Sequence, residues 1–243
     1  MKKNLLLLCA MVVSAPAFAQ HNSTDFKDAA TTGPFPIYLG VGFANSFRNQ
    51  DFVDVGKAFY DFNNVDARVL TRMYGIQLFA GASIVQEGWP FSLVGEVRHL
   101  LLTRTEKANS DYFIIRSNQT TLGLGIRYAK FPLVGQFQFG PVLKYTRDYD
   151  FELASVERRF RHQPNFAGWS GLVRISILDP AGTEGGLGIY IESGFNFINA
   201  GNNDDITKAI QVFQEDFTDP RKAKRRYGYL SFGILLPIAI RIK

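Results

Sequence analysis

Residues that could perform acid–base or nucleophilic chemistry are scarce in this chain of 243 residues. It contains three histidines and one cysteine. His99 is followed two residues later by Leu101, and no residue near it supplies a nucleophile and an orienting carboxylate together. His21 and His162 stand far from it, so histidine and cysteine do not cluster as metal ligands do. We therefore predict no catalytic site, no metal and no cofactor, although folding can assemble a triad from distant positions.

A second group of reactive side chains is charged and falls on one face of segments in which large apolar residues alternate with small or polar ones. Its members are Glu96, Arg98, Arg127, Lys144, Arg174 and Glu192. A charge in a narrow interior of low dielectric must be paired or solvated, so we expect these six to form one network. Two interpretations of that network are open: a structural plug that neutralises buried charge, which we favour, and a gate or narrow path for ions.

The alternating segments are the elements that must position these charges. They cover residues 37–44, 74–81, 91–101, 122–128, 136–146, 169–177, 187–197 and 229–240. In the first, Leu39, Val41 and Phe43 alternate with glycine and alanine. Because strand side chains alternate between faces, the period of two predicts eight strands, each with one apolar face and one small or polar face.

The N-terminal residues have the composition of an export signal. Lys2 and Lys3 precede an apolar run over 5–13, and the small residues of Ala17-Phe18-Ala19 mark a cleavage site. We expect residues 1–19 to be removed together with the single cysteine, which excludes disulfide bonds from the mature chain. The formal net charge of +5 is mild and its basic residues are scattered, so we expect no nucleic-acid partner.

The connections between the segments alternate in length. Short connections with glycine or proline cover 86–90, 130–132 and 179–186, and longer polar ones cover 48–68, 105–111, 147–165 and 199–226. Membrane barrels place short turns in the periplasm and long loops outside. We therefore predict an all-β fold, an eight-stranded antiparallel transmembrane β-barrel over 37–243 whose apolar face meets lipid, after a short periplasmic segment at 20–36.

Two of the long connections contain apolar residues at helical spacing. They are Phe52, Val55, Phe59 and Phe62 in the first loop, and Ile206, Ala209, Ile210, Phe213 and Phe217 in the last. Such spacing marks one face of a helix. We expect short helices in the outer loops, either packed over the barrel mouth or presenting a docking surface for a protein partner.

The signal peptide, the eight segments and the closing stretch 227–240 together resemble the small outer-membrane β-barrel proteins of Gram-negative bacteria, among which PorT-like barrels are one candidate subgroup. The resemblance implies a place in the cell outer membrane and no particular activity. Some barrels of this size modify lipid A with a His and a Ser supported by a carboxylate near the outer leaflet, so a lipid A-modifying enzyme is a third hypothesis. It stands behind a non-enzymatic structural or binding protein, which we favour, and a narrow pore or channel.

The stretch that leads into the last segment is basic. Lys224, Arg225 and Arg226 precede Tyr227 and Tyr229, an aromatic pair that we expect in the interfacial girdle of the barrel. Lysine and arginine at that depth meet lipid phosphates. We predict that the three basic residues contact lipopolysaccharide, the alternative being solvated loop charge. The sequence leaves the ligand, the partner and the oligomeric state open.

Overall fold

The strands of the chain form one antiparallel sheet that closes on itself. The computed structural model describes residues 37–47, 50–66, 72–85, 91–130, 133–153, 156–162, 168–178, 187–199, 204–213 and 224–238. The predicted signal peptide at 1–19 and segment at 20–36 lie outside these residues. The strands are β1 (Ile37–Phe47), β2 (Arg72–Val85), β3 (Phe91–Ala108), β4 (Asp111–Lys130), β5 (Leu133–Leu153), β6 (Val156–His162), β7 (Gly168–Leu178), β8 (Gly188–Asn199) and β9 (Lys224–Ile238).

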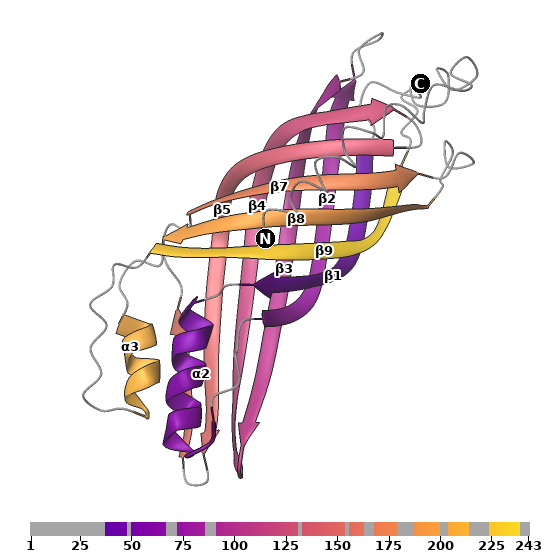
Figure 1. Ribbon diagram of the computed structural model, residues 1–243. Helices are drawn as coiled ribbons and strands as arrows, with labels where there is room; N and C mark the ends of the chain where they lie inside the picture. The colour runs from indigo at the N-terminus through magenta and orange to yellow at the C-terminus, as the bar shows by residue number, and fades with distance from the viewer. Residues whose placement is uncertain are drawn as a thin grey trace, which may run out of the picture.

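The barrel closes because the first strand pairs with the last. β1 pairs antiparallel with β2 on one side and with β9 on the other, from Ile37 opposite Ile238 to Phe47 opposite Gly228. Around the barrel the order is β1-β2-β3-β4-β5-β7-β8-β9, and β6 pairs with β5 beyond the wall. The predicted eight-stranded antiparallel barrel is confirmed (Figure 1). In a bilayer this closure matters, because an open sheet edge would leave backbone groups without partners.

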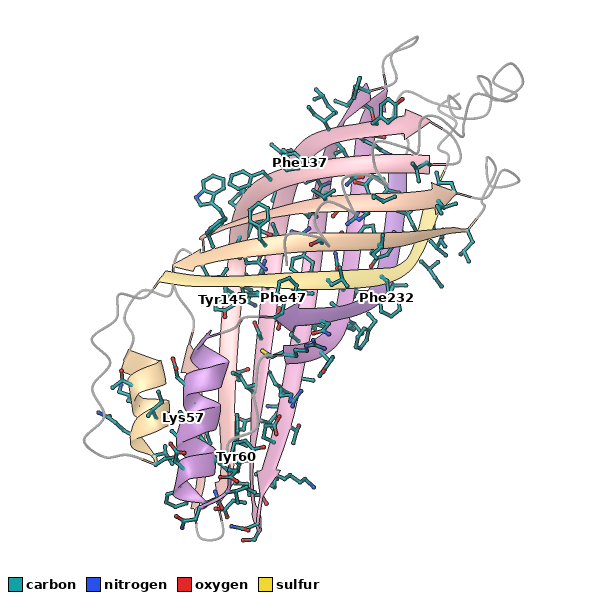
Figure 2. All side chains as sticks on the ribbon, in the orientation of Figure 1. Phe47, Lys57, Tyr60, Phe137, Tyr145 and Phe232 are labelled. Carbon is teal, nitrogen blue, oxygen red and sulfur yellow. The ribbon has the colours of Figure 1, made fainter. Side chains whose placement is uncertain are left out.

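The barrel wall is apolar on its outside and polar within. Phe137 and Phe232, labelled in Figure 2, are 52% and 57% exposed, whereas Arg174 and Glu192 are 0% and 1% exposed. A protein dissolved in water shows the reverse distribution. The predicted assignment of the faces, apolar to lipid and polar to the lumen, is therefore correct for the wall as a whole.

One end of the barrel carries a folded extension, which we call the outer lobe. β3, β4 and β5 are 18, 20 and 21 residues long, against 11 in β1 and 12 in β8, so they continue beyond the wall. The outer lobe consists of these strand ends, β6 and the helices α2 (Gln50–Phe62) and α3 (Asp204–Gln211), which lie beside them (Figure 1). Both predicted loop helices are thereby confirmed, and no helix in the described part of the chain is long and apolar enough to cross a membrane.

The prediction of loops at residues 105–111 and 147–165 is wrong, because most of these residues form strands in the lobe. Residues 105–111 form a strand hairpin that turns over two residues, and much of 147–165 belongs to β5 and β6. Outside lipid, a strand needs an apolar residue only on its covered face, so the charges of the other face gave these segments the composition of loops. Asn109 turns the hairpin with a left-handed φ of 55°, which asparagine tolerates, and its side-chain amide donates to the carbonyl oxygen of Asn63 at 3.1 Å.

Aromatic side chains inside the barrel lie against glycines of the neighbouring strand. Gly40 is paired directly with Phe79, and a Cβ atom on Gly40 would lie 2.0 Å from the ring carbon Cζ of Phe79. Tyr38 and Gly81 repeat the arrangement with the strands exchanged. The missing side chains make room for large rings in a lumen of fixed width.

We expect Gly40→Ala to lower the free energy of unfolding by about 1–3 kcal/mol, because the new methyl group displaces the Phe79 ring. Urea unfolding in detergent micelles measures it. Gly135→Ala is the matched control, since nothing lies within 4 Å of a Cβ atom there, and it should cost less than about 1 kcal/mol. Equal effects of the two substitutions would contradict the packing argument.

Candidate functional site

The centre of the lumen is occupied by an arginine held between two glutamates. Arg174 of β7 donates from Nη1 and Nη2 to the two carboxylate oxygens of Glu96 at 2.6 and 2.9 Å, and from Nε to Oε2 of Glu192 at 2.7 Å. Its side chain and both carboxylates are fully shielded from solvent. Charge-assisted bonds to a planar guanidinium are among the strongest polar contacts in proteins, so this triad fixes the middle of the barrel.

A second arginine joins the triad from the opposite wall. Nη1 of Arg98 on β3 donates to Oε1 of Glu192 on β8 at 3.3 Å, and its Nη2 donates to Ser170 Oγ at 2.9 Å. Glu192 Oε1 also accepts bonds from Gln77 Nε2 at 2.8 Å and from the Tyr229 hydroxyl at 2.6 Å. Two arginines and two glutamates therefore form a cluster without net charge, which offsets the cost of burying each one. We call Glu96, Arg98, Arg174 and Glu192 the lumen cluster.

Rings and amides complete the filling of this layer. The guanidinium carbon of Arg174 lies 3.6 Å from the ring centroid of Phe79 and 5.4 Å from that of Tyr190, within the range of cation–π attraction. The hydroxyl of Tyr38 donates to Glu96 Oε2 at 3.0 Å, and Gln136 Nε2 donates to the same oxygen at 3.3 Å. Side chains from strands all around the barrel meet here, as expected in an eight-stranded interior.

Arg127, another of the six charged residues singled out in the sequence, lies beside the cluster without joining it. Its guanidinium carbon is 5.3 Å from the ring centroid of Tyr38, and its Nε is buried without a hydrogen-bond partner. Among the described residues it makes no ion pair with Glu96 or Glu192. The expectation of a single network that includes it is therefore not met.

The placement of Lys144 in the lumen is wrong. A β-bulge shifts the register between β4 and β5, so that Thr121 pairs with Val142 and Thr120 pairs with Lys144. The extra residue in β5 makes Leu143 and Lys144 both exposed. Regular alternation along a strand is what assigns each residue of the sequence to the inner or the outer face, and a bulge breaks that alternation. The lysine side chain therefore lies on the outside of the barrel.

Four neutral residues bind the lumen cluster, and the pattern of charged residues in the sequence does not indicate them. Hydroxyl or amide groups donate hydrogen bonds to the buried carboxylates from Tyr38, Gln77, Gln136 and Tyr229. The signal that could have found them is their position on the inward face of each strand. Tyr38 in particular interrupts a face of glycine and alanine with a large ring.

Above this layer the lumen continues into the core of the outer lobe. One cluster of buried side chains includes Leu100, Tyr145 and Tyr229 of the barrel together with Val55 and Phe59 of α2. The ring of Phe59 lies 4.9 Å from that of Phe113 on β4, and the Tyr60 hydroxyl donates to Glu106 Oε2 at 2.6 Å. Helix α2 is thus fastened to the long strands that Figure 2 shows beside it. Val55 and Phe59 of its apolar face are packed, whereas Phe62 at its end is exposed.

His99 lies on the outer surface of the barrel and has a partner that the sequence did not suggest. Its Nδ1 is 2.9 Å from Oγ1 of Thr120 on the neighbouring strand. Among the described residues neither side chain contacts a carboxylate, so a hydroxyl and an imidazole meet there without an orienting acid. In the same part of the chain, no three His, Cys, Asp or Glu side chains converge as metal ligands would.

The basic stretch predicted to contact lipopolysaccharide forms the first residues of β9. Lys224, Arg225 and Arg226 pair through their backbones with Asn199, Ile198 and Phe197 of β8, and their side chains lie outside the described part of the structure.

The interfacial position expected for Tyr227 and Tyr229 is wrong, because both are buried in the lumen, where their hydroxyls donate to Gln119 Oε1 at 2.5 Å and to Glu192 Oε1 at 2.6 Å. Tyrosines of the lumen and of a membrane girdle are the same residue type, and they differ only in whether their position in the strand faces inward or outward.

A closed barrel with an apolar outer wall, a polar lumen that holds a charge-neutral cluster and a lobe at one end defines the class of the protein: it is an eight-stranded β-barrel of the bacterial outer membrane. The sequence matches no family model and no curated protein. Finer membership, including the PorT-like subgroup, stays a prediction.

Several solved barrels have a distantly similar structure. Ail, the attachment invasion locus protein of Yersinia pestis, crystallised with the heparin analogue sucrose octasulfate, is 9% identical over 85% of this chain and 100% of its own, with a TM-score of 0.47. Neisserial surface protein A is 12% identical over 86% of this chain and 98% of its own (TM-score 0.37). The protease OmpT of Escherichia coli is 8% identical over 83% and 95% (TM-score 0.40). The class assignment rests on the geometry above.

We expect Arg174→Leu to lower the free energy of unfolding by about 3–5 kcal/mol, because it leaves Glu96 and Glu192 as buried carboxylates without their main partner. Arg116→Leu is the control. It removes the ion pair with Asp150 on the outer lobe, where the arginine side chain is 49% exposed, and should cost less than about 1 kcal/mol. Thermal unfolding of both variants in detergent compares them, and equal losses would show that the lumen cluster adds nothing to stability.

Proposed function

We propose that the protein is a non-enzymatic outer-membrane barrel that binds a partner through its outer lobe. The observation that carries the proposal is the lobe itself: two helices and the ends of three long strands share a buried aromatic core that includes Phe59, Phe113 and Phe151. A barrel that served only as an anchor would need no folded structure outside lipid. Ordered elements on a rigid support are how proteins commonly present binding residues.

A side chain on the lobe supports the same proposal. Phe62, at the end of α2, is 48% exposed, and its ring lies 5.5 Å from that of Phe213. The other large apolar side chains that are exposed in the described residues lie on barrel strands or, in the case of Leu187, directly before β8. Exposed aromatic residues outside a lipid-facing wall are enriched at protein interfaces, which makes the end of α2 the favoured contact point for a protein partner.

The pore hypothesis is disfavoured by the two closures of the lumen. The lumen cluster crosses the barrel with Arg174 and Glu96 bound to each other, and the outer mouth is covered by the core that joins Phe59 to Tyr229. Ions would have to displace both. The enzyme hypothesis is disfavoured by the contacts of His99 and Thr120, because a threonine hydroxyl needs a base held in place by a third group.

We also propose that Lys224, Arg225 and Arg226 contact lipopolysaccharide. The pairing between β8 and β9 supports this contact, because Arg226 pairs with Phe197, whose ring is 43% exposed on the outer wall. An exposed aromatic residue near the end of a wall strand is typical of the membrane interface, where phosphate groups are within reach.

We expect no steady single-channel conductance from the wild-type protein in planar bilayers, because the lumen cluster blocks the centre. A variant without residues 50–64 should be equally silent, since it loses the cover of the mouth but keeps the cluster. Protease protection verifies that both proteins are inserted. A steady conductance in the wild type would refute the closed lumen.

A photo-crosslinking amino acid at Asp61, beside Phe62, should trap a discrete partner on intact cells. Combining it with Phe62→Ser should reduce the adduct at least about fivefold, because interface aromatics carry a large share of binding energy. The same amino acid at Gly182, in the connection between β7 and β8 that we expect on the periplasmic side, is the control and should give no such adduct. Adducts that do not depend on Phe62, or none from Asp61, would overturn the proposed role of the lobe.

A further inference from the structure

A short row of polar side chains interrupts the apolar outer wall of the barrel. His99, Thr120 and Lys144 lie on the adjacent strands β3, β4 and β5, with His99 paired to Thr120 and Thr120 paired to Lys144. The same wall exposes Val97 and Leu143 beside them, 48% and 58%. Polar groups against hydrocarbon are unfavourable unless they reach water or a polar partner, so this row needs a polar neighbour.

The bulge in β5 is what turns the lysine outward. Val142 is buried, Leu143 is exposed, and regular alternation would return the next residue to the lumen. The register shift instead gives Lys144 the exposed side, where it is paired across the strands with Thr120. Bulges commonly re-aim a single side chain at a functional position.

The depth of the row follows from its surroundings on the wall. Below it, the rings of Phe139 on β5 and Trp169 on the neighbouring β7 stack 5.2 Å apart with an interplanar angle of 3°, and both are exposed, as aromatic residues of a membrane girdle are. Beyond it, the same face of β4 carries the exposed Arg116, which is paired with Asp150 in the outer lobe. The row therefore stands where the apolar wall gives way to polar surface, at the level of lipid headgroups.

We propose that His99, Thr120 and Lys144 form a binding site for a phosphate group of an outer-leaflet lipid, the phosphorylated glycolipid lipopolysaccharide. A lysine ammonium supplies charge, and the threonine hydroxyl, accepting a hydrogen bond from Nδ1–H of His99, donates its own proton to a phosphate oxygen. Asp150, an acid of the same face of β5, is already engaged by Arg116. The site stands apart from the contact proposed for residues 224–226, because β9 lies opposite β4 in the barrel order.

Trp169 provides a local reporter of binding. The chain has two tryptophans, so Trp89→Phe leaves Trp169 as the single source of tryptophan fluorescence, on the wall that carries Lys144. In this background, purified barrels in detergent micelles are titrated with lipopolysaccharide and with the same lipopolysaccharide after enzymatic removal of its phosphates. Heat-modifiable migration on gels verifies that each variant is folded.

Lys144→Gln should weaken the binding of phosphorylated lipopolysaccharide about tenfold, because one charge-assisted contact is lost. Lys144→Arg should bind as the parent does, and Thr120→Val should weaken binding by a smaller factor. Lys107→Gln, which removes an equally exposed lysine at the end of β3, is the matched control and should have no effect. Dephosphorylated lipopolysaccharide should bind the parent as weakly as the phosphorylated form binds Lys144→Gln.

Binding by Lys144→Gln that equals the parent, or an equal loss in Lys107→Gln, would overturn the site. The combined variant Lys224→Gln, Arg225→Gln and Arg226→Gln separates the two lipid proposals. If it alone loses affinity, phosphate contact belongs to the β9 flank and the site at Lys144 fails. If Lys144→Gln alone loses affinity, the site at Lys144 stands and the contact at β9 fails.

Discussion

The whole molecule depends on one constraint: inside a bilayer, the backbone of a strand finds no water, so each strand must have a neighbour on both sides. Pairing of β1 with β9 meets that requirement for the eight wall strands. Closure with eight strands then sets a narrow interior, too small to be filled by bulk water. The polar face of every strand is turned into this interior, and its charges must therefore find one another.

The lumen cluster is the answer to that second requirement. Two arginines face two glutamates, and each glutamate carboxylate is bound by more than one donor, so the cluster has no net charge. The guanidinium of Arg174 lies over the rings of Phe79 and Tyr190, while its N–H groups bind the carboxylates. The glycines of the wall belong to the same solution, since Gly40 provides the space in which Phe79 lies.

Much of this architecture could be predicted from the sequence, because the two faces of a barrel wall produce a period of two in the residues. The eight strands, the direction of their faces and both loop helices follow from that period and from helical spacing. Four of six charged residues, among them Arg174 and Glu192, are in the lumen cluster, whereas Lys144 is not, because a bulge changes parity without any mark in composition. The hairpin beyond residue 105 could not be predicted from the alternation of apolar and polar residues, because its outward face meets water instead of lipid and is polar. Partners such as Thr120 on His99 depend on register between strands, which residue types alone do not specify.

The continuity of the buried cluster above the lumen links the lobe to the order of assembly. Its side chains come from β1 (Ala44), from β4 (Phe113), from helix α2 (Phe59) and from the last strand (Tyr227). A chain whose final strand has not yet joined β1 cannot complete that cluster, so aromatic surface of the lobe stays open until the ring is sealed. The finished lobe is accordingly a mark of a correctly closed barrel, and an unfinished one exposes the kind of surface that chaperones and proteases recognise.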